Sequence, residues 1–181
     1  MPIPVAGRPC LPPVTLILGG ARSGKSRYAE RLVENTASKG TYCATAEAGD
    51  AEMAERIAAH RARRGPFWRT VEAPLVLASA IAAHAQPERP ILVDCLTLWM
   101  SNLLLAGKQA DEEAGALRSA LRKAAGPVVL VSNEVGMGLV PETRLGRRFR
   151  DAAGSLNQEI AALADCVVFI AAGLPLVLKE G

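Results

Sequence analysis

The chain has 181 residues, of which half are hydrophobic and only 4% aromatic, and its formal net charge is +3. This length suits one domain with a sizeable core, and no apolar run approaches the roughly 18 residues that a membrane-spanning helix needs. The weak net charge, without a long basic tail, gives little reason to expect a nucleic-acid partner.

Residues 1–13 are rich in proline and lack the apolar core of a signal peptide, so we expect a flexible N-terminal extension before a domain spanning 14–181. The four cysteines are widely scattered, without a C-x-x-C pair or a nearby histidine that would suggest zinc. Three of them, Cys43, Cys95 and Cys166, stand in apolar stretches, where cysteine is usually a small buried hydrophobe. A reducing cytoplasm is therefore the expected compartment.

The strongest motif begins at an apolar run, 14–18, which predicts a buried strand, and a helical pattern follows over 27–36. Between them the sequence GGARSGKS fits the P-loop pattern G-x-x-x-x-G-K-[ST] in the strand–loop–helix context that the motif requires. Backbone N–H groups of such a loop and the following helix N-terminus bind phosphates. The predicted nucleotide-binding loop comprises Gly19, Gly20, Ala21, Arg22, Ser23, Gly24, Lys25 and Ser26. Lys25 would contact the β- and γ-phosphates, and the Ser26 hydroxyl would help to bind Mg²⁺.

Apolar strands and helices alternate along the rest of the chain. Further strands are expected at 41–45, 67–72, 91–94, 127–132, 166–172 and 174–178, and helices at 50–64, 73–85, 95–106, 111–125 and 141–164. Gly154 could interrupt the last helix. This order predicts an α/β fold: a single P-loop NTPase-like domain, with a mostly parallel sheet and helices on both faces.

Two carboxylates close predicted strands and would therefore lie at the sheet edge where ligands bind. Asp94 has the position of the Mg²⁺-binding carboxylate of P-loop enzymes, but it could equally cap the helix that follows. Glu72 could accept hydrogen bonds from a guanine base or a ribose, or be an ordinary acid at a strand end. The segment from Asn133 to Gly138 predicts a flexible loop at the same edge. The sequence shows no obvious base for the substrate hydroxyl. Asp94 and Glu134 are the candidates, and their geometry does not follow from the sequence.

His60 is one of two histidines, and arginines flank it in the sequence RIAAHRARR. Nearby cations disfavour the protonated imidazole and so keep a nitrogen lone pair available, and the arginines could hold phosphates. Both properties suit a histidine that attacks a nucleotide phosphate. The alternative is a solvated basic helix end with an incidental histidine, because runs of charged residues usually lie at the surface. His84 has no such neighbours and is expected to be structural. A second basic face, over 144–150, could bind phosphate or only water.

Several segments together resemble one family, the bifunctional adenosylcobinamide kinase/adenosylcobinamide-phosphate guanylyltransferases of cobalamin biosynthesis. They are the P-loop, the segment DAEMAERIAAHR ending at Arg61, WRTVE ending at Glu72, DCLTL beginning at Asp94, and SNEVGMGLVPE ending at Glu142. The resemblance runs from about residue 16 to 177. It implies two reactions: ATP or GTP phosphorylates the hydroxyl of adenosylcobinamide, and GMP is then transferred from GTP to the new phosphate through a guanylylated histidine, releasing pyrophosphate.

The resemblance also implies roles for particular residues. His60 matches the guanylylated histidine, and Lys25 the catalytic lysine of the P-loop. The further nucleotide contacts that it implies are Ala44, Thr45, Ala46, Arg61, Ala62, Arg63, Arg64, Glu72 and Asp94. Mg²⁺ would be held by Ser26 and Asp94. The family also implies small-molecule partners, the corrinoid and the nucleoside triphosphate, and a homo-oligomer, with a trimer as the expected form. The alternatives are a simple P-loop small-molecule kinase and a nucleotide-dependent switch protein.

Overall fold

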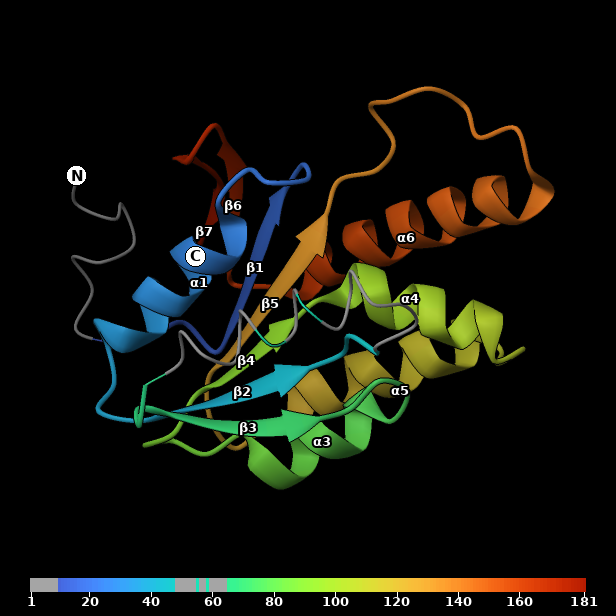
Figure 1. The fold of residues 1–181 in the computed structure, drawn as a ribbon. Helices are drawn as coiled ribbons and strands as arrows, with labels where there is room; N and C mark the ends of the chain where they lie inside the picture. The colour runs from blue at the N-terminus through green and yellow to red at the C-terminus, as the bar shows by residue number, and fades with distance from the viewer. Residues whose placement is uncertain (1–9, 48–54, 56–57, 59–64) are drawn as a thin grey trace.

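The computed structural model describes residues 10–47, 55, 58 and 65–181. Seven strands form one sheet in the order β3-β2-β4-β5-β1-β6-β7 (Figure 1). The strands are β1 (Val14–Gly19), β2 (Gly40–Ala44), β3 (Trp68–Glu72), β4 (Ile91–Asp94), β5 (Val128–Asn133), β6 (Cys166–Ala171) and β7 (Leu174–Glu180). All neighbours pair in parallel except β6 and β7. The prediction of a mostly parallel α/β sheet is confirmed, and each predicted strand end is right to within two residues.

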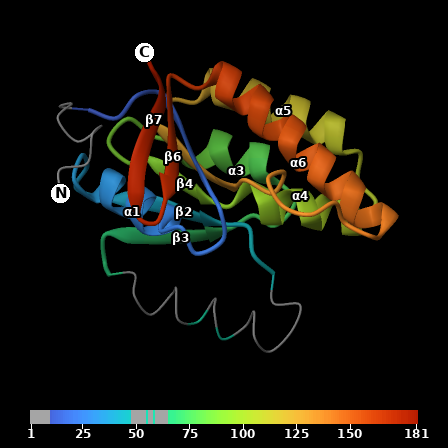
Figure 2. The same ribbon diagram turned by 90° about the horizontal axis from the view of Figure 1, so that it is seen from above.

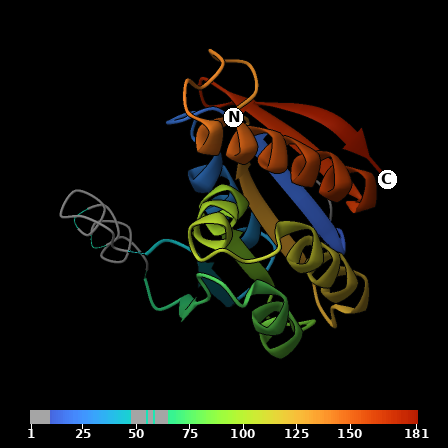
Figure 3. The same ribbon diagram turned by 90° about the vertical axis from the view of Figure 1, so that its right-hand side faces the viewer.

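The described helices cover the two faces of the sheet unequally (Figure 2). They are α1 (Lys25–Glu34), α3 (Leu77–His84), α4 (Leu96–Leu105), α5 (Ala110–Lys123) and α6 (Arg144–Leu163). Side chains of α1 pack with Ile17 and Val129 in one core cluster, whereas those of α3 to α6 pack with Leu16 and Leu130 in the other. Figure 3 shows α3 to α6 together in front of the sheet. The helix expected over 50–64 lies outside the described residues.

Helix α6 begins three residues later than the sequence pattern predicts. The Thr143 hydroxyl accepts a hydrogen bond from the Gly146 N–H at 3.0 Å, which is the N-cap interaction that fixes a helix start. The helix then runs through Gly154 without interruption. A Cβ at Gly154 would meet no described atom within 4 Å, so no close packing there forces a break. The interruption considered at Gly154 was wrong.

The packed part of the domain includes residues before β1. Leu11 is only 7% exposed and packs in the core cluster on the α1 side. The Pro13 carbonyl accepts a hydrogen bond from the Val128 N–H at 2.9 Å, so this segment extends the contact between β1 and β5. The described chain is thus packed from Leu11 onward, three residues before the expected boundary at Val14.

We expect the substitution Leu11→Ala to lower the free energy of unfolding by about 2 kcal/mol, because it removes a buried side chain and leaves a cavity. Urea denaturation followed by circular dichroism would measure this difference. Cys10→Ala, at the exposed neighbouring position, is the matched control and should change stability by less than about 0.5 kcal/mol. An equally small effect for both substitutions would show that Leu11 contributes nothing to the core.

Two further expectations concern the burial of the cysteines and the lack of a membrane-spanning helix. Cys43, Cys95 and Cys166 are buried free thiols, as predicted, and burial raises the pKa of Cys43 to about 12. Within the described ranges, we find no helix that is long and apolar enough to cross a membrane.

Candidate nucleotide-binding site

The predicted site residues at strand ends come together at the carboxyl edge of the sheet. Ala44, at the end of β2, is in register with both Glu72 on β3 and Asp94 on β4. Strand β5 lies between β4 and β1, and its last residue, Asn133, is in register with Gly19 at the start of the P-loop. In parallel α/β sheets this edge is where ligands bind. The fold thus brings the P-loop and Asp94 to one edge, one strand apart.

The P-loop has the predicted strand–loop–helix context, between β1 and α1. Gly24 has a φ of 96°, a left-handed conformation that favours glycine, and it precedes the first residue of the helix. The Ser23 carbonyl accepts a hydrogen bond from the Gly173 N–H at 2.8 Å. A Cβ on Gly19 would lie 2.6 Å from the Ile170 carbonyl oxygen, so a larger residue cannot be accommodated without movement. The β6–β7 hairpin therefore packs against the P-loop and supports it.

Lys25 lies close to its own loop and to the end of β4. Its side chain is 8% exposed, and its Nζ donates a hydrogen bond to the Gly20 carbonyl at 3.0 Å. Burial lowers the pKa of Lys25 below its ordinary value of 10.5, while the nearby Cys95 and Asp94 act in the opposite direction. The ammonium group is therefore partly desolvated before a phosphate binds.

This lowered pKa predicts how triphosphate binding depends on pH. Phosphate binding favours the protonated ammonium. The affinity for the triphosphate should therefore fall as the pH rises above the pKa of Lys25 in the free protein, and this pKa is lower than 10.5. The fall should approach about tenfold per pH unit. Titrations with a fluorescent GTP analogue between pH 7 and 10 would measure it.

Lys25→Arg is the control for this pH profile, because a guanidinium stays protonated over the whole range and the titration of the nucleotide itself is common to both proteins. Parallel pH profiles for the two proteins would contradict a role for the charge of Lys25 in binding.

Asp94 does not cap the helix that follows it. The N-cap of α4 is Cys95, whose Sγ accepts a hydrogen bond from the Leu98 N–H at 3.5 Å. The Asp94 carboxylate instead accepts a 2.6 Å hydrogen bond from the Tyr42 hydroxyl through Oδ2. Of the two roles left open for Asp94, capping was wrong, because the thiol one residue later already takes the helix N–H. Asp94 thus remains available to the nucleotide edge.

The turn after β2 is fixed to the end of β4. Thr45 is fully buried, and its Oγ1 both accepts from the Cys95 N–H and donates to the Cys95 carbonyl, each at 2.7 Å. The Asn102 amide on α4 donates to the Thr45 carbonyl at 2.8 Å. The Thr45 side chain therefore holds the backbone next to Asp94. A direct contact of residues 44–46 with nucleotide stays a prediction.

The loop after β5 starts against the P-loop, because the Glu134 N–H donates to the Gly19 carbonyl at 3.1 Å. The Glu134 carboxylate then accepts hydrogen bonds from two N–H groups of its own loop, those of Gly136 at 2.6 Å and Met137 at 3.1 Å. These hydrogen bonds hold the carboxylate against its own loop. Both base candidates therefore accept hydrogen bonds, Glu134 from its loop and Asp94 from Tyr42, and a role for either as the base stays a prediction.

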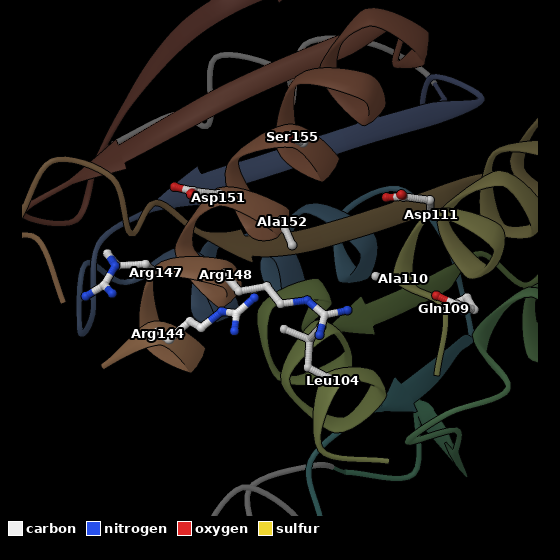
Figure 4. Close-up of a pocket in the computed structure, with 10 residues that line it drawn as sticks. All are labelled: Leu104, Gln109, Ala110, Asp111, Arg144, Arg147, Arg148, Asp151, Ala152 and Ser155. Carbon is white, nitrogen blue, oxygen red and sulfur yellow. The ribbon is translucent and has the colours of Figure 1, made fainter. Parts of the chain in front are cut away.

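The second basic face lies along the first turns of α6. Arg147 donates to the carbonyls of Pro141 and Glu142, and Arg150 pairs with Asp151 at 3.3 Å. Arg144 and Arg148 help to line a hollow of about 510 Å³ between α4, α5 and α6, and Figure 4 shows Arg148 extending towards Leu104 on α4. Among the described residues that line this hollow, none comes from the P-loop.

The structure describes only one of the two histidines, His84. His60 lies outside the described residues, as do Arg61, Ala62, Arg63 and Arg64. His84 ends α3, after which the chain passes to the start of β4, and the intervening Gln86 lies against Gly126 just before β5. His84 is therefore near the amino edge of the sheet, opposite the P-loop, as expected for a structural residue.

Sequence reasoning missed Tyr42, whose hydroxyl reaches Asp94 although the two residues are 52 positions apart. The only signal for it was a tyrosine within the predicted strand 41–45. Such a side chain usually finds a hydrogen-bond partner when it is buried.

Comparisons with known proteins show the family of the chain. The model of the family described as cobinamide kinase / cobinamide phosphate guanyltransferase matches residues 15–178. The chain is 53% identical to the bifunctional adenosylcobalamin biosynthesis protein CobP of Pseudomonas aeruginosa, over 91% of this chain and 96% of that protein. It is 42% identical to the bifunctional adenosylcobalamin biosynthesis protein CobU of Salmonella typhimurium, over 91% and 98%.

Among solved structures, an ATPase from the type III secretion system of pathogenic bacteria superposes with a TM-score of 0.53 at 12% identity, covering 97% of this chain and 61% of that one. This likeness concerns the fold alone and agrees with a P-loop NTPase-like domain. Both curated relatives are matched over nearly their whole length. The chain is therefore a transferase that belongs to the cobinamide kinase/cobinamide phosphate guanyltransferase family.

Proposed function

We propose that the protein phosphorylates adenosylcobinamide with ATP or GTP and then transfers GMP from GTP to adenosylcobinamide phosphate, giving adenosylcobinamide-GDP and pyrophosphate. The observation that carries the proposal is the P-loop with Lys25 and Asp94 at one sheet edge, in a chain that the family model matches from residue 15 to 178. One triphosphate site of this kind can serve both transfers, because both begin with an attack on a phosphorus of a bound nucleoside triphosphate, the γ-phosphorus in the first and the α-phosphorus in the second.

In the kinase step the substrate hydroxyl oxygen attacks the γ-phosphorus, and the bond from that phosphorus to the nucleoside diphosphate breaks. Positioning and charge neutralisation are the main contributions that an enzyme makes to such a transfer. The loop N–H groups and the Lys25 ammonium supply both. Asp94, half-buried at the same edge, would orient the nucleotide and its metal, and the proton of the hydroxyl would pass to water or to an oxygen of the transferred phosphoryl group.

The oxygen atoms at this edge suit Mg²⁺. The Ser26 hydroxyl is on the first turn of α1, and Asp94 has one carboxylate oxygen, Oδ1, besides the one bound by Tyr42. Magnesium prefers oxygen ligands and usually takes only one or two from the protein beside the nucleotide phosphates. No group of three metal-ligating side chains occurs in the described part of the chain, which is consistent with such a site. When bound, Mg²⁺ neutralises charge on the β- and γ-phosphates.

In the guanylyl transfer, an imidazole nitrogen of His60 would attack the α-phosphorus of GTP while the bond to pyrophosphate breaks. A phosphate oxygen of adenosylcobinamide phosphate would then attack the same phosphorus, break the phosphorus–nitrogen bond and restore the histidine. The resemblance to the family supports His60 in this role. The distance of His84 from the P-loop edge supports it further, because the chain contains only two histidines.

The same family resemblance leads us to propose a homo-oligomer, with a trimer as the expected form. The buried free cysteines lead us to propose a cytoplasmic location. The nucleotide contacts of Ala44, Thr45, Ala46, Glu72 and the segment 61–64 are likewise part of this proposal.

Mass spectrometry of the corrinoid products would test the proposed function. With adenosylcobinamide, GTP and Mg²⁺, we expect first the added mass of one phosphoryl group and then that of a further GMP. A product that stops at the phosphate would identify a simple kinase, and an unchanged corrinoid would contradict the proposal.

A further inference from the structure

We propose that Tyr42 is a positioning residue that fixes one oxygen of the Asp94 carboxylate, so that the other oxygen faces the nucleotide and its metal. This inference rests on the proposed function, since it concerns how the triphosphate edge is assembled. Neither the P-loop motif nor the family match assigns a role to Tyr42.

The contact itself is short and partly buried. The Tyr42 hydroxyl donates to Asp94 Oδ2 at 2.6 Å, and the Tyr42 side chain is 2% exposed. Hydrogen bonds to an ionised carboxylate at this length are about twice as strong as those between neutral groups. Because Oδ2 is engaged by the tyrosine, Oδ1 is the oxygen left to interact with a ligand at the sheet edge.

The ring that carries this hydroxyl is held by packing. Tyr42 meets Trp68 edge to face, with ring centroids 5.8 Å apart and an interplanar angle of 89°. The Trp68 indole N–H in turn donates to Glu34 at the end of α1, at 2.9 Å. The hydroxyl is therefore aimed at Asp94 by neighbours on β3 and α1, and little side-chain freedom is lost when the hydrogen bond forms.

The chain directly after β2 holds the backbone at the same point. Thr45, the residue that follows the last residue of β2, binds both the N–H and the carbonyl of Cys95 through one hydroxyl. The Thr45 N–H also donates to the Asp94 carbonyl at 3.2 Å. Tyr42 fixes the Asp94 side chain and Thr45 fixes its backbone, so β2 and the turn after it set the orientation of a carboxylate that belongs to β4.

The test uses Tyr42→Phe, which removes the hydroxyl but keeps the ring against Trp68. The readout is the affinity for a fluorescent GTP analogue with Mg²⁺ and with EDTA, and the ratio of the two affinities measures how strongly metal supports binding. We expect Tyr42→Phe to lower this ratio about tenfold, the size expected for one hydrogen bond to a charged group, with affinity in EDTA unchanged. The same titration with Mn²⁺ should show the same loss.

Tyr28→Phe is the matched control. Tyr28 is also buried on the α1 side, and its hydroxyl has no hydrogen-bond partner in the described part of the structure. This substitution should leave the metal-to-EDTA ratio unchanged. Circular dichroism of both variants separates an effect on the site from an effect on folding.

A double-mutant cycle with Asp94→Asn tests whether Tyr42 acts through Asp94. In the Asp94→Asn background, Tyr42→Phe should change the ratio by less than about twofold, because the carboxylate that it positions is already gone. The proposal is overturned if Tyr42→Phe weakens binding equally with metal and with EDTA, or if its effect is the same in both backgrounds. Wild-type protein that binds no nucleotide would instead contradict the proposed function.

Discussion

Lys25→Ala should abolish triphosphate binding and both transfers while leaving the fold intact. The Lys25 ammonium is partly desolvated beside the P-loop, and its loss would remove the charge-assisted hydrogen bonds that the motif predicts to the β- and γ-phosphates. Such bonds contribute about 1.5–3 kcal/mol each, so we expect GTP affinity to fall by at least about a hundredfold. The fold should persist because alanine is well tolerated at the first position of α1, and the lost hydrogen bond to Gly20 lies within the loop.

Nucleotide titration and circular dichroism together measure this outcome. Lys108→Ala is the matched control, since Lys108 is exposed in the connection between α4 and α5, and it should bind GTP like the wild-type protein. Unchanged GTP affinity in a folded Lys25→Ala protein would remove the basis for a nucleotide site at this sheet edge.

His60→Ala should lose guanylyl transfer by several orders of magnitude and keep phosphorylation of adenosylcobinamide. The kinase step passes the γ-phosphoryl group directly from nucleotide to substrate and needs no imidazole. The second step loses its covalent carrier, which water cannot replace. Separate assays of γ-phosphoryl transfer to the corrinoid and of GMP transfer to its phosphate would measure the two effects.

His84→Ala is the control for this separation. His84 lies at the end of α3, near the amino edge of the sheet, and both transfers should continue when it is replaced. If His60→Ala protein still accumulates covalent GMP, or if His84→Ala protein loses it, the assignment of His60 is wrong.

The parts of the fold that follow from local pattern could be predicted from the sequence. The P-loop and the strand that ends at Asp94 are short segments with strong signals, an apolar run followed by glycines or by a carboxylate. Helix starts were less accurate. The start of α6 depends on which of several polar residues acts as the N-cap, and the structure shows that it is Thr143.

What could not be predicted depends on contacts between distant segments. That Tyr42 reaches Asp94 follows from the pairing of β2 with β4, and no local pattern specifies which strands become neighbours. The burial of Leu11 likewise depends on packing against α1 and β5. Glu134 was a candidate base in the sequence, and no local pattern showed that the turn of its own loop brings two N–H groups to the carboxylate.

In the proposed mechanism one P-loop domain performs two transfers, one direct and one through a covalent histidine. Incubation of the protein with GTP labelled at either the α- or the γ-phosphorus, with and without adenosylcobinamide, distinguishes the two. We predict that α-label remains on the denatured protein in alkali, is released by acid as a phosphorus–nitrogen bond requires, and maps to the peptide with His60, while γ-label passes to the corrinoid. Transfer of γ-label without any protein-bound α-label would contradict this mechanism and leave a simple kinase, and slow release of phosphate with neither transfer would indicate a nucleotide-dependent switch.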